Sequence, residues 1–162
     1  MKTKRFFTAL AISLISSAIT ANAEQLFGDI QPEQRNDSVM TVNIYAEGDD
    51  LAGIKENLKG IEGLKNSNFD EAGELTSVEV IYSNIAETHD AIAKRLTDGI
   101  NALGLTSMVD TDSDGSHIEI YAEPSDDPTS QNLKRLIVFV TDKNEVTAVL
   151  LEGNITPPND NN

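Results

Sequence analysis

The sequence predicts an α+β fold: an antiparallel β-sheet that ends in a four-strand meander, with two helices packed on one face. Two segments, 51–61 and 85–103, repeat apolar residues at the period of an amphipathic helix. After Gly104 the apolar period changes to that of strands, and turn-rich stretches separate four short apolar segments. An antiparallel sheet with its helices on one side belongs to the α+β class.

The first strand and the first helix are expected near residue 50. Residues 39–46 are rich in β-branched and aromatic residues, which favour a strand. Asp50 can cap the helix that follows, and Gly60 can end it. The apolar stripe of this helix consists of Leu51, Ile54, Leu58 and Ile61.

A second strand, 77–82, follows an acidic loop over 66–74, and a second helix follows the strand. Asn84 and Glu87 have the spacing of a capping box, with Asn in place of the usual Ser or Thr. Gly104 is the expected C-cap residue. The apolar face of this helix consists of Ile92, Leu96, Ile100 and Leu103.

The meander is predicted from residues 105–109, 117–122, 133–141 and 146–151. In the second of these segments the apolar residues alternate with His117, Glu119 and Tyr121. The third and fourth segments are apolar on both faces, so they should lie centrally. We expect the second helix to cover one core group: Ile118, Ile120, Leu136, Val138, Val149 and Leu151.

The two ends of the chain are expected to lie outside the folded domain. Residues 1–23 resemble a secretory signal peptide: a basic start, a 14-residue apolar run over 6–19, and Ala21-Asn22-Ala23 as the cleavage site. That run is shorter than the roughly 20 residues that a spanning helix needs. Residues 24–37 are expected to form a flexible leader and 157–162 a disordered tail, which leaves 38–156 as a single domain.

The composition of the chain limits the classes of partner that it can bind. Without the signal peptide the chain carries 9 Lys and Arg against 27 Asp and Glu, so it should repel nucleic acid and anionic membranes. Basic peptides, proteins and divalent cations remain as partners. The chain has no Cys, so it has no disulfides and no lipid-anchored cysteine. The signal-peptide pattern of residues 1–23, without a lipid-anchored Cys, predicts a periplasmic or secreted protein.

The Asp110–Gly115 segment is the one motif that suggests a cofactor. Asp110, Asp112 and Asp114 with Gly115 match the first half of a Ca²⁺-binding loop. The closing position of such a loop requires Glu, and here it is Tyr121. The alternative is a hairpin turn at Asp114-Gly115, and we favour it because Asp-Gly is a preferred turn pair.

Other candidate residues are few. His117 and Glu119 share one strand face and could supply two metal ligands, but zinc needs three or four, and nothing places His89 beside them. No nucleophile motif is present. A catalytic triad is defined by geometry and not by sequence spacing, so a hydrolase with an unrecognised site stays as a third hypothesis. Asp37-Ser38-Val39 has the form of a bacterial glycosylation triplet at Ser38; the alternative is a cap at the start of the strand.

The C-terminal half resembles a bacterial exported family catalogued as domain of unknown function 4252. The similarity rests on the helix ending near Leu103, the acidic hairpin, and short motifs that follow. These motifs are Gly60–Leu64, Leu105-Thr106-Ser107-Met108, Ile118-Glu119-Ile120-Tyr121, the run 133–140 and the run 149–155.

This resemblance covers roughly residues 51–156 and implies a small exported α+β protein without a known activity. Many members carry a lipid-anchored Cys that this chain lacks. The sequence as a whole favours a non-enzymatic interaction module of the cell envelope. A calcium-stabilised binding domain is the second hypothesis.

Overall fold

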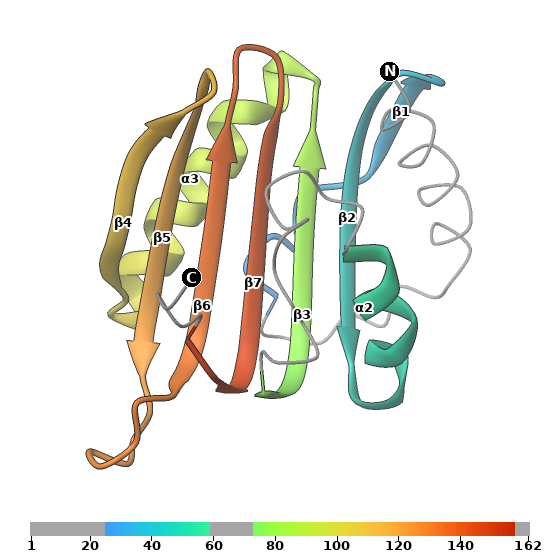
Figure 1. Ribbon diagram of the computed structural model, residues 1–162. Coiled ribbons are helices and arrows are strands. Elements are labelled where there is room, and N and C mark those ends of the chain that lie inside the picture. The colour runs from blue at the N-terminus through green and yellow to red at the C-terminus, as the bar shows by residue number, and fades with distance from the viewer. Residues whose placement is uncertain (1–24, 59–72, 158–162) are drawn as a thin grey trace.

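A computed structural model describes residues 25–58 and 73–157 (Figure 1). Seven strands, two α-helices and one 3-10 helix make up this part of the chain. In chain order they are β1 (Glu33–Asn36), β2 (Val39–Glu47), η1 (Gly48–Asp50), α2 (Leu51–Leu58), β3 (Gly73–Ser83), α3 (Ala86–Leu103), β4 (Thr106–Ser113), β5 (Ser116–Pro124), β6 (Leu133–Thr141) and β7 (Val146–Ile155).

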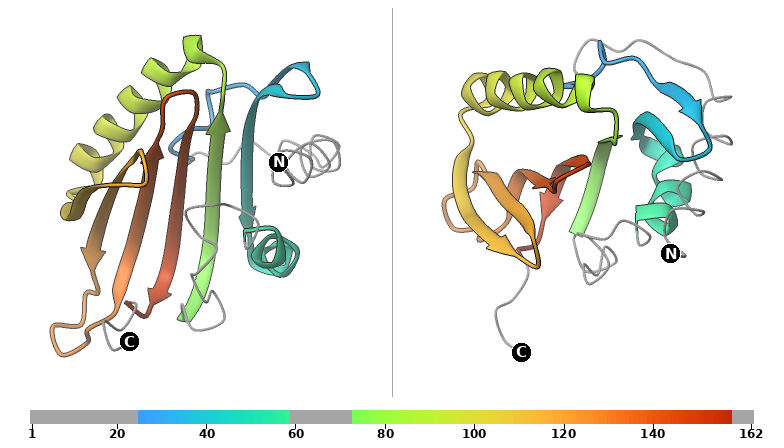
Figure 2. Two further views of the ribbon diagram at one scale, coloured as in Figure 1. Left: turned by 45° about the horizontal axis from the view of Figure 1, so that its top comes forward. Right: turned by 90° about the horizontal axis from the view of Figure 1, so that it is seen from above.

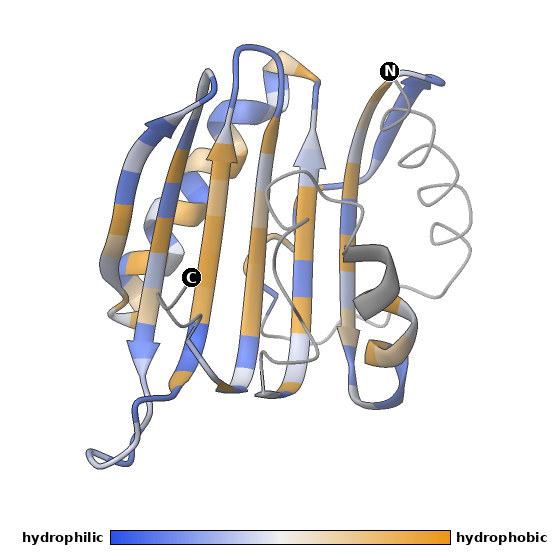
Figure 3. Ribbon diagram, viewed as in Figure 1, coloured by the Kyte–Doolittle hydropathy of each residue, from blue (hydrophilic) through white to orange (hydrophobic). Residues whose placement is uncertain are grey.

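All seven strands belong to one antiparallel sheet with the order β1-β2-β3-β7-β6-β5-β4. The predicted α+β class and the C-terminal meander β4-β5-β6-β7 are therefore confirmed. Strands β3, β7 and β6 lie in the middle, and the apolar runs of β6 and β7 favour this position (Figure 3). The pairing of β3 with β7 joins the two halves of the chain.

The two helices lie on opposite faces of the sheet, so the expectation that both pack on one face is wrong (Figure 2). On one face, called the α2 face, Leu51 and Ile54 pack with Val78 and Val80. On the other, called the α3 face, Leu96 belongs to a separate core cluster. Strands that are apolar on both sides can bury each side under a different helix.

The core group assigned to the second helix is wrong for the same reason. Leu136, Val138, Val149 and Leu151 point to the α2 face, with Ile118 and Ile120 on the same side by register. Helix α3 covers the alternate positions of these strands. Its cluster on the sheet consists of Ile81, Ile137, Phe139, Val146, Ala148 and Leu150.

The ends of α3 show one prediction confirmed and one overturned. Gly104 has φ +65°, and the amides of residues 104 and 105 bond back to the last turn, so it is the C-cap residue. Asn84 does not cap the N-terminus. Its side chain instead links the segment before α3 to the start of β2. It accepts a hydrogen bond from the Met40 amide at 2.8 Å and donates one to the Ser38 carbonyl at 2.6 Å.

Residues 25–36, expected as part of a flexible leader, are packed against the sheet. Phe27 is fully buried and Ile30 is 8% exposed, both within the core cluster under α3. Strand β1 then pairs with the start of β2. The segment is mostly polar, so its composition does not reveal that Phe27 and Ile30 anchor it to the sheet. A single buried aromatic side chain removes a large apolar area from water.

Several sequence predictions concern residues outside the described part of the chain. These are the signal peptide over 1–23, the helix end at Gly60, the passage over 60–64, most of the loop over 66–74 and the tail after Pro157. Neither α-helix of the described residues combines the length and apolarity that crossing a membrane requires.

Candidate functional site

The acidic segment 110–115 is part of a hairpin. Strand β4 continues through Asp110 and Asp112 to Ser113, and β5 begins at Ser116. Asp114 and Gly115 have φ +52° and +88°, the left-handed values at both central positions of a two-residue turn. The three aspartates therefore do not converge as in a calcium loop: two lie along a strand and one lies at the tip.

His117 lies among the carboxylates of this hairpin on the α3 side of the sheet. Its Nδ1 is 3.0 Å from Asp112, and its Nε2 is 3.5 Å from Asp110 and 4.0 Å from Glu119. The hydrogen bond to Asp112, aided by the three negative charges, raises the pKa of His117. When it is protonated, the imidazole offsets part of the charge repulsion along this exposed edge.

Within residues 25–58 and 73–157, no cluster of three or more His, Asp or Glu side chains is arranged to hold a metal ion. We expect calorimetric titration of Ca²⁺ at about 0.15 M salt to show no saturable micromolar site, because the ligands that would close a cage around the ion are missing. A single micromolar site that disappears in Asp112→Ala would contradict the turn assignment, and Asp126→Ala serves as the matched control.

The other predicted residues lie apart from this hairpin. His89, on α3, contacts the main-chain carbonyl of Ser83 at 3.2 Å rather than a hydroxyl nucleophile. Ser38 is exposed in the two-residue turn between β1 and β2, where its amide bonds to the side chain of Asn36 at 2.8 Å. Ser38 is therefore accessible, and its glycosylation stays a prediction.

A chemically distinct surface lies on the α2 face over β5 and β6. Here five apolar side chains point to the same side and each is only partly buried. They are Ile118, Ile120, Leu136, Val138 and Val140, and we call them the β5–β6 apolar face. Helix α2 contacts β2 and β3, so none of the described elements covers this part of the sheet.

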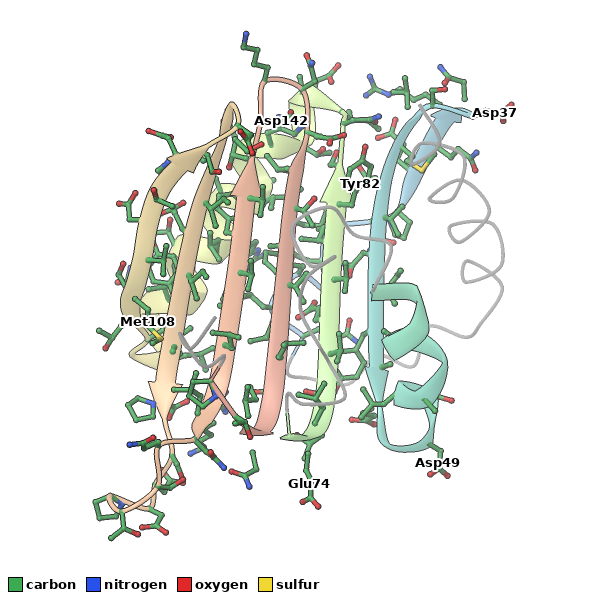
Figure 4. The ribbon with its side chains drawn as sticks, viewed as in Figure 1. Asp37, Asp49, Glu74, Tyr82, Met108 and Asp142 are labelled. Carbon is green, nitrogen blue, oxygen red and sulfur yellow. The ribbon has the colours of Figure 1, made fainter. Side chains whose placement is uncertain are left out.

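The edge strand β4 extends this surface. Val109 pairs with Ile120 and is 37% exposed, and Met108, in the bulge beside it, is 56% exposed. These two are the exposed large hydrophobic side chains among the described residues. Met108 is labelled on the edge strand in Figure 4. Soluble proteins seldom leave such a contiguous apolar patch open unless it binds something.

Carboxylates border the β5–β6 apolar face at both ends. Asp114 and Asp142 lie in the two turns at one end, and Asp126 and Asp127 lie in the β5–β6 loop at the other. Residues 105–156 contain ten acidic side chains against three Lys and Arg. Of those cations, Lys134 binds Asp126 at 3.1 Å, so the surface is apolar in the middle and negative around it.

The sequence did not reveal an ionic cluster on the opposite face. Arg135 donates to Glu152 at 2.6 Å and to Glu123, and the Ser77 hydroxyl donates to Glu152 at 2.7 Å. Both carboxylates are engaged by the guanidinium, which matches a structural ion pair across β5, β6 and β7. Register alone could have paired these side chains once the strand order was known.

Comparison with protein-family models, with curated proteins and with solved structures finds no match to this chain.

Proposed function

We propose that this protein is an exported, non-enzymatic binding domain of the bacterial cell envelope, and that it takes a cationic amphipathic protein segment on the β5–β6 apolar face. The observation that carries the proposal is this partly exposed apolar face, which none of the described elements covers. Removing apolar surface from water contributes about 2.5 kcal/mol per 100 Å² before the costs of association.

The charge around the apolar face selects the partner. Acidic side chains lie at both ends of β5 and β6, so an approaching Lys- or Arg-rich segment gains attraction where a neutral or acidic one does not. Apolar residues of the partner supply contact area, while its cations speed association and give specificity. A partner that is apolar on one side and basic on the other satisfies both demands.

Export is supported by the signal-peptide pattern of residues 1–23. A domain without disulfides needs another source of stability in an oxidising compartment, and the two core clusters on either side of the sheet supply it. Hydrolysis has less support, because in the described part of the chain His117 contacts carboxylates and His89 contacts a main-chain carbonyl.

The test is a titration with a fluorescent 16-residue peptide of alternating Leu and Lys. We expect saturable binding with a Kd of about 1–100 μM. Raising the salt from about 0.05 to 0.5 M should weaken binding about tenfold or more, because the charged rim is screened. A peptide with Glu in place of Lys should not bind.

Ile120→Lys puts a cation in the middle of the β5–β6 apolar face and should weaken binding at least tenfold. Its matched control is Thr97→Lys, which adds the same charge on the exposed surface of α3, on the other side of the sheet. If both variants bind equally, whether weakly or well, the peptide responds to net charge alone and the apolar face is not the site.

A further inference from the structure

A second feature, independent of the apolar face, is the way the first described residues are held. Residues 25–30, which we call the N-terminal strap, lie against α3, β2 and β3. The amides of Leu26 and Phe27 donate to the two oxygens of Glu79 at 2.7 and 2.8 Å. The Asn43 amide group donates to the carbonyls of Phe27 and Ile30 at 2.6 and 3.1 Å.

Side chains complete this contact. Phe27 is fully buried in the cluster beneath α3. Leu26 fits against Gly99 of α3 so closely that a Cβ at that position would lie 2.3 Å from Leu26 Cδ1. Asp29 forms an ion pair with Arg95 on the helix surface. The strap is therefore bound as a peptide is, through main-chain donors, main-chain acceptors and one aromatic anchor.

Glu79 is the unusual member of this set because it is 1% exposed. Burial raises the pKa of its carboxyl to about 7, the two strap amides oppose that rise, and the charge of Glu152 adds to it. Tyr45, opposite Glu79 on β2, stays neutral because burial and Glu47 raise the pKa of its hydroxyl to about 12.

The remaining charged groups around Glu79 are already paired. Arg135 holds Glu152 on the neighbouring strands, while Arg95 of α3 holds Asp29 of the strap. None of the cations in the described part of the chain forms an ion pair with Glu79. Its carboxylate oxygens instead accept hydrogen bonds from two main-chain amides. Among the described residues, only the two strap amides compensate its charged form, and burial disfavours that form more strongly than the two bonds favour it.

We propose that the N-terminal strap is a proton-controlled element, docked most firmly when Glu79 is neutral and loosened when Glu79 is charged. In this proposal, opening the strap exposes the carboxylate to water, where a glutamate has its ordinary pKa of 4.5. The docked state therefore binds more protons than the open one, and docking weakens as pH rises from about 4.5 to about 7. Above about pH 7 docking weakens little further, because Glu79 is then charged in both the docked and the open state. Opening also exposes Ile81, Ile92 and Gly99, against which Phe27 and Leu26 pack.

Amide hydrogen exchange of the complete exported protein tests this directly. The protection factors of Leu26 and Phe27, corrected for the intrinsic pH dependence of exchange, should fall roughly 50- to 100-fold between pH 5 and pH 8. The amide of Ser125, bonded to Asn132 far from the strap, and that of Ile137 in central β6 should change far less.

Three variants separate Glu79 from other titrating groups, including the amino terminus that signal cleavage would create. Glu79→Gln should remove the pH dependence. Glu152→Gln should move the midpoint of the fall to lower pH, because the charge that raises the pKa of Glu79 is gone. Gly99→Ala should lower strap protection at every pH and keep the slope, since the added Cβ displaces Leu26.

A flat profile in the unsubstituted protein overturns the proposal. So does an equal fall in Glu79→Gln, which would assign the effect to another group, or an equal fall at Ile137, which would show global unfolding instead of local opening. Should Glu79→Gln fail to fold, the midpoint in Glu152→Gln decides the question: an unchanged midpoint excludes Glu79 as the titrating group.

Discussion

Phe27→Ala should lower the free energy of unfolding by about 3–5 kcal/mol, the range for truncating a fully buried aromatic side chain. Phe27 has no exposed surface and packs with Ile81 and Ile92 under α3. The loss should appear as a lower midpoint in guanidinium unfolding at an unchanged slope. This is a large effect for a residue in a segment whose polar composition predicts a flexible leader.

The matched control lies two residues further on. Asp29→Ala removes an exposed side chain and its ion pair with Arg95, which should cost no more than about 1 kcal/mol. If Phe27→Ala changes stability as little as Asp29→Ala, then residues 25–30 do not dock in solution, and the flexible leader expected from composition is correct after all.

Leu96→Ala should cost about 2–5 kcal/mol, because Leu96 is 4% exposed and anchors α3 to the sheet. Denaturant unfolding measures it, and Thr97→Ala, at the adjacent exposed position of the same helix, provides the control. A shift no larger than that of the control would mean that α3 does not pack through this residue.

A double-mutant cycle determines which face of the sheet α3 covers. Leu96→Ala should couple with Ile137→Val, since both side chains lie in the cluster beneath α3. It should be additive with Val138→Ala, whose side chain belongs to the opposite face. Coupling to Val138 in place of Ile137 would restore the arrangement that the sequence suggested.

Local patterns were enough to predict the elements. Short apolar segments separated by turn residues located the strands of the meander, and for β6 they reproduced the observed bounds Leu133–Thr141. The spacing of apolar residues together with Gly104 located α3 and its end. The Asp114-Gly115 pair predicted the turn from residue chemistry alone, because Gly readily adopts positive φ and Asp tolerates it.

The same patterns could not predict which side of the sheet each helix covers. In β6 and β7 both alternate sets are apolar, so periodicity shows that two faces are buried but does not say which one a helix covers. That choice depends on the strand order and on the path of the chain from β3 to β4, both of which are set by long-range contacts.

The strap was missed for a different reason. Its sequence is mostly polar and aperiodic, and its anchors are single residues, Leu26, Phe27 and Ile30. The groups that hold it, Glu79 and Asn43, lie in strands where a polar residue is ordinarily assigned to the solvent face. A buried Glu inside the otherwise apolar run 78–81 was the available signal, since a charge at such a position requires nearby donors.

The position of β7 has a consequence for how the chain acquires its structure. The last strand pairs with both β3 and β6, so the middle of the sheet cannot form until residues 146–155 are available. A chain threaded through a translocation pore from its N-terminus delivers these residues last. Contacts of such long sequence separation slow folding. Under the proposed export, a chain that enters the pore before its last strand has paired completes its sheet on the far side of the membrane, after residues 146–155 have crossed.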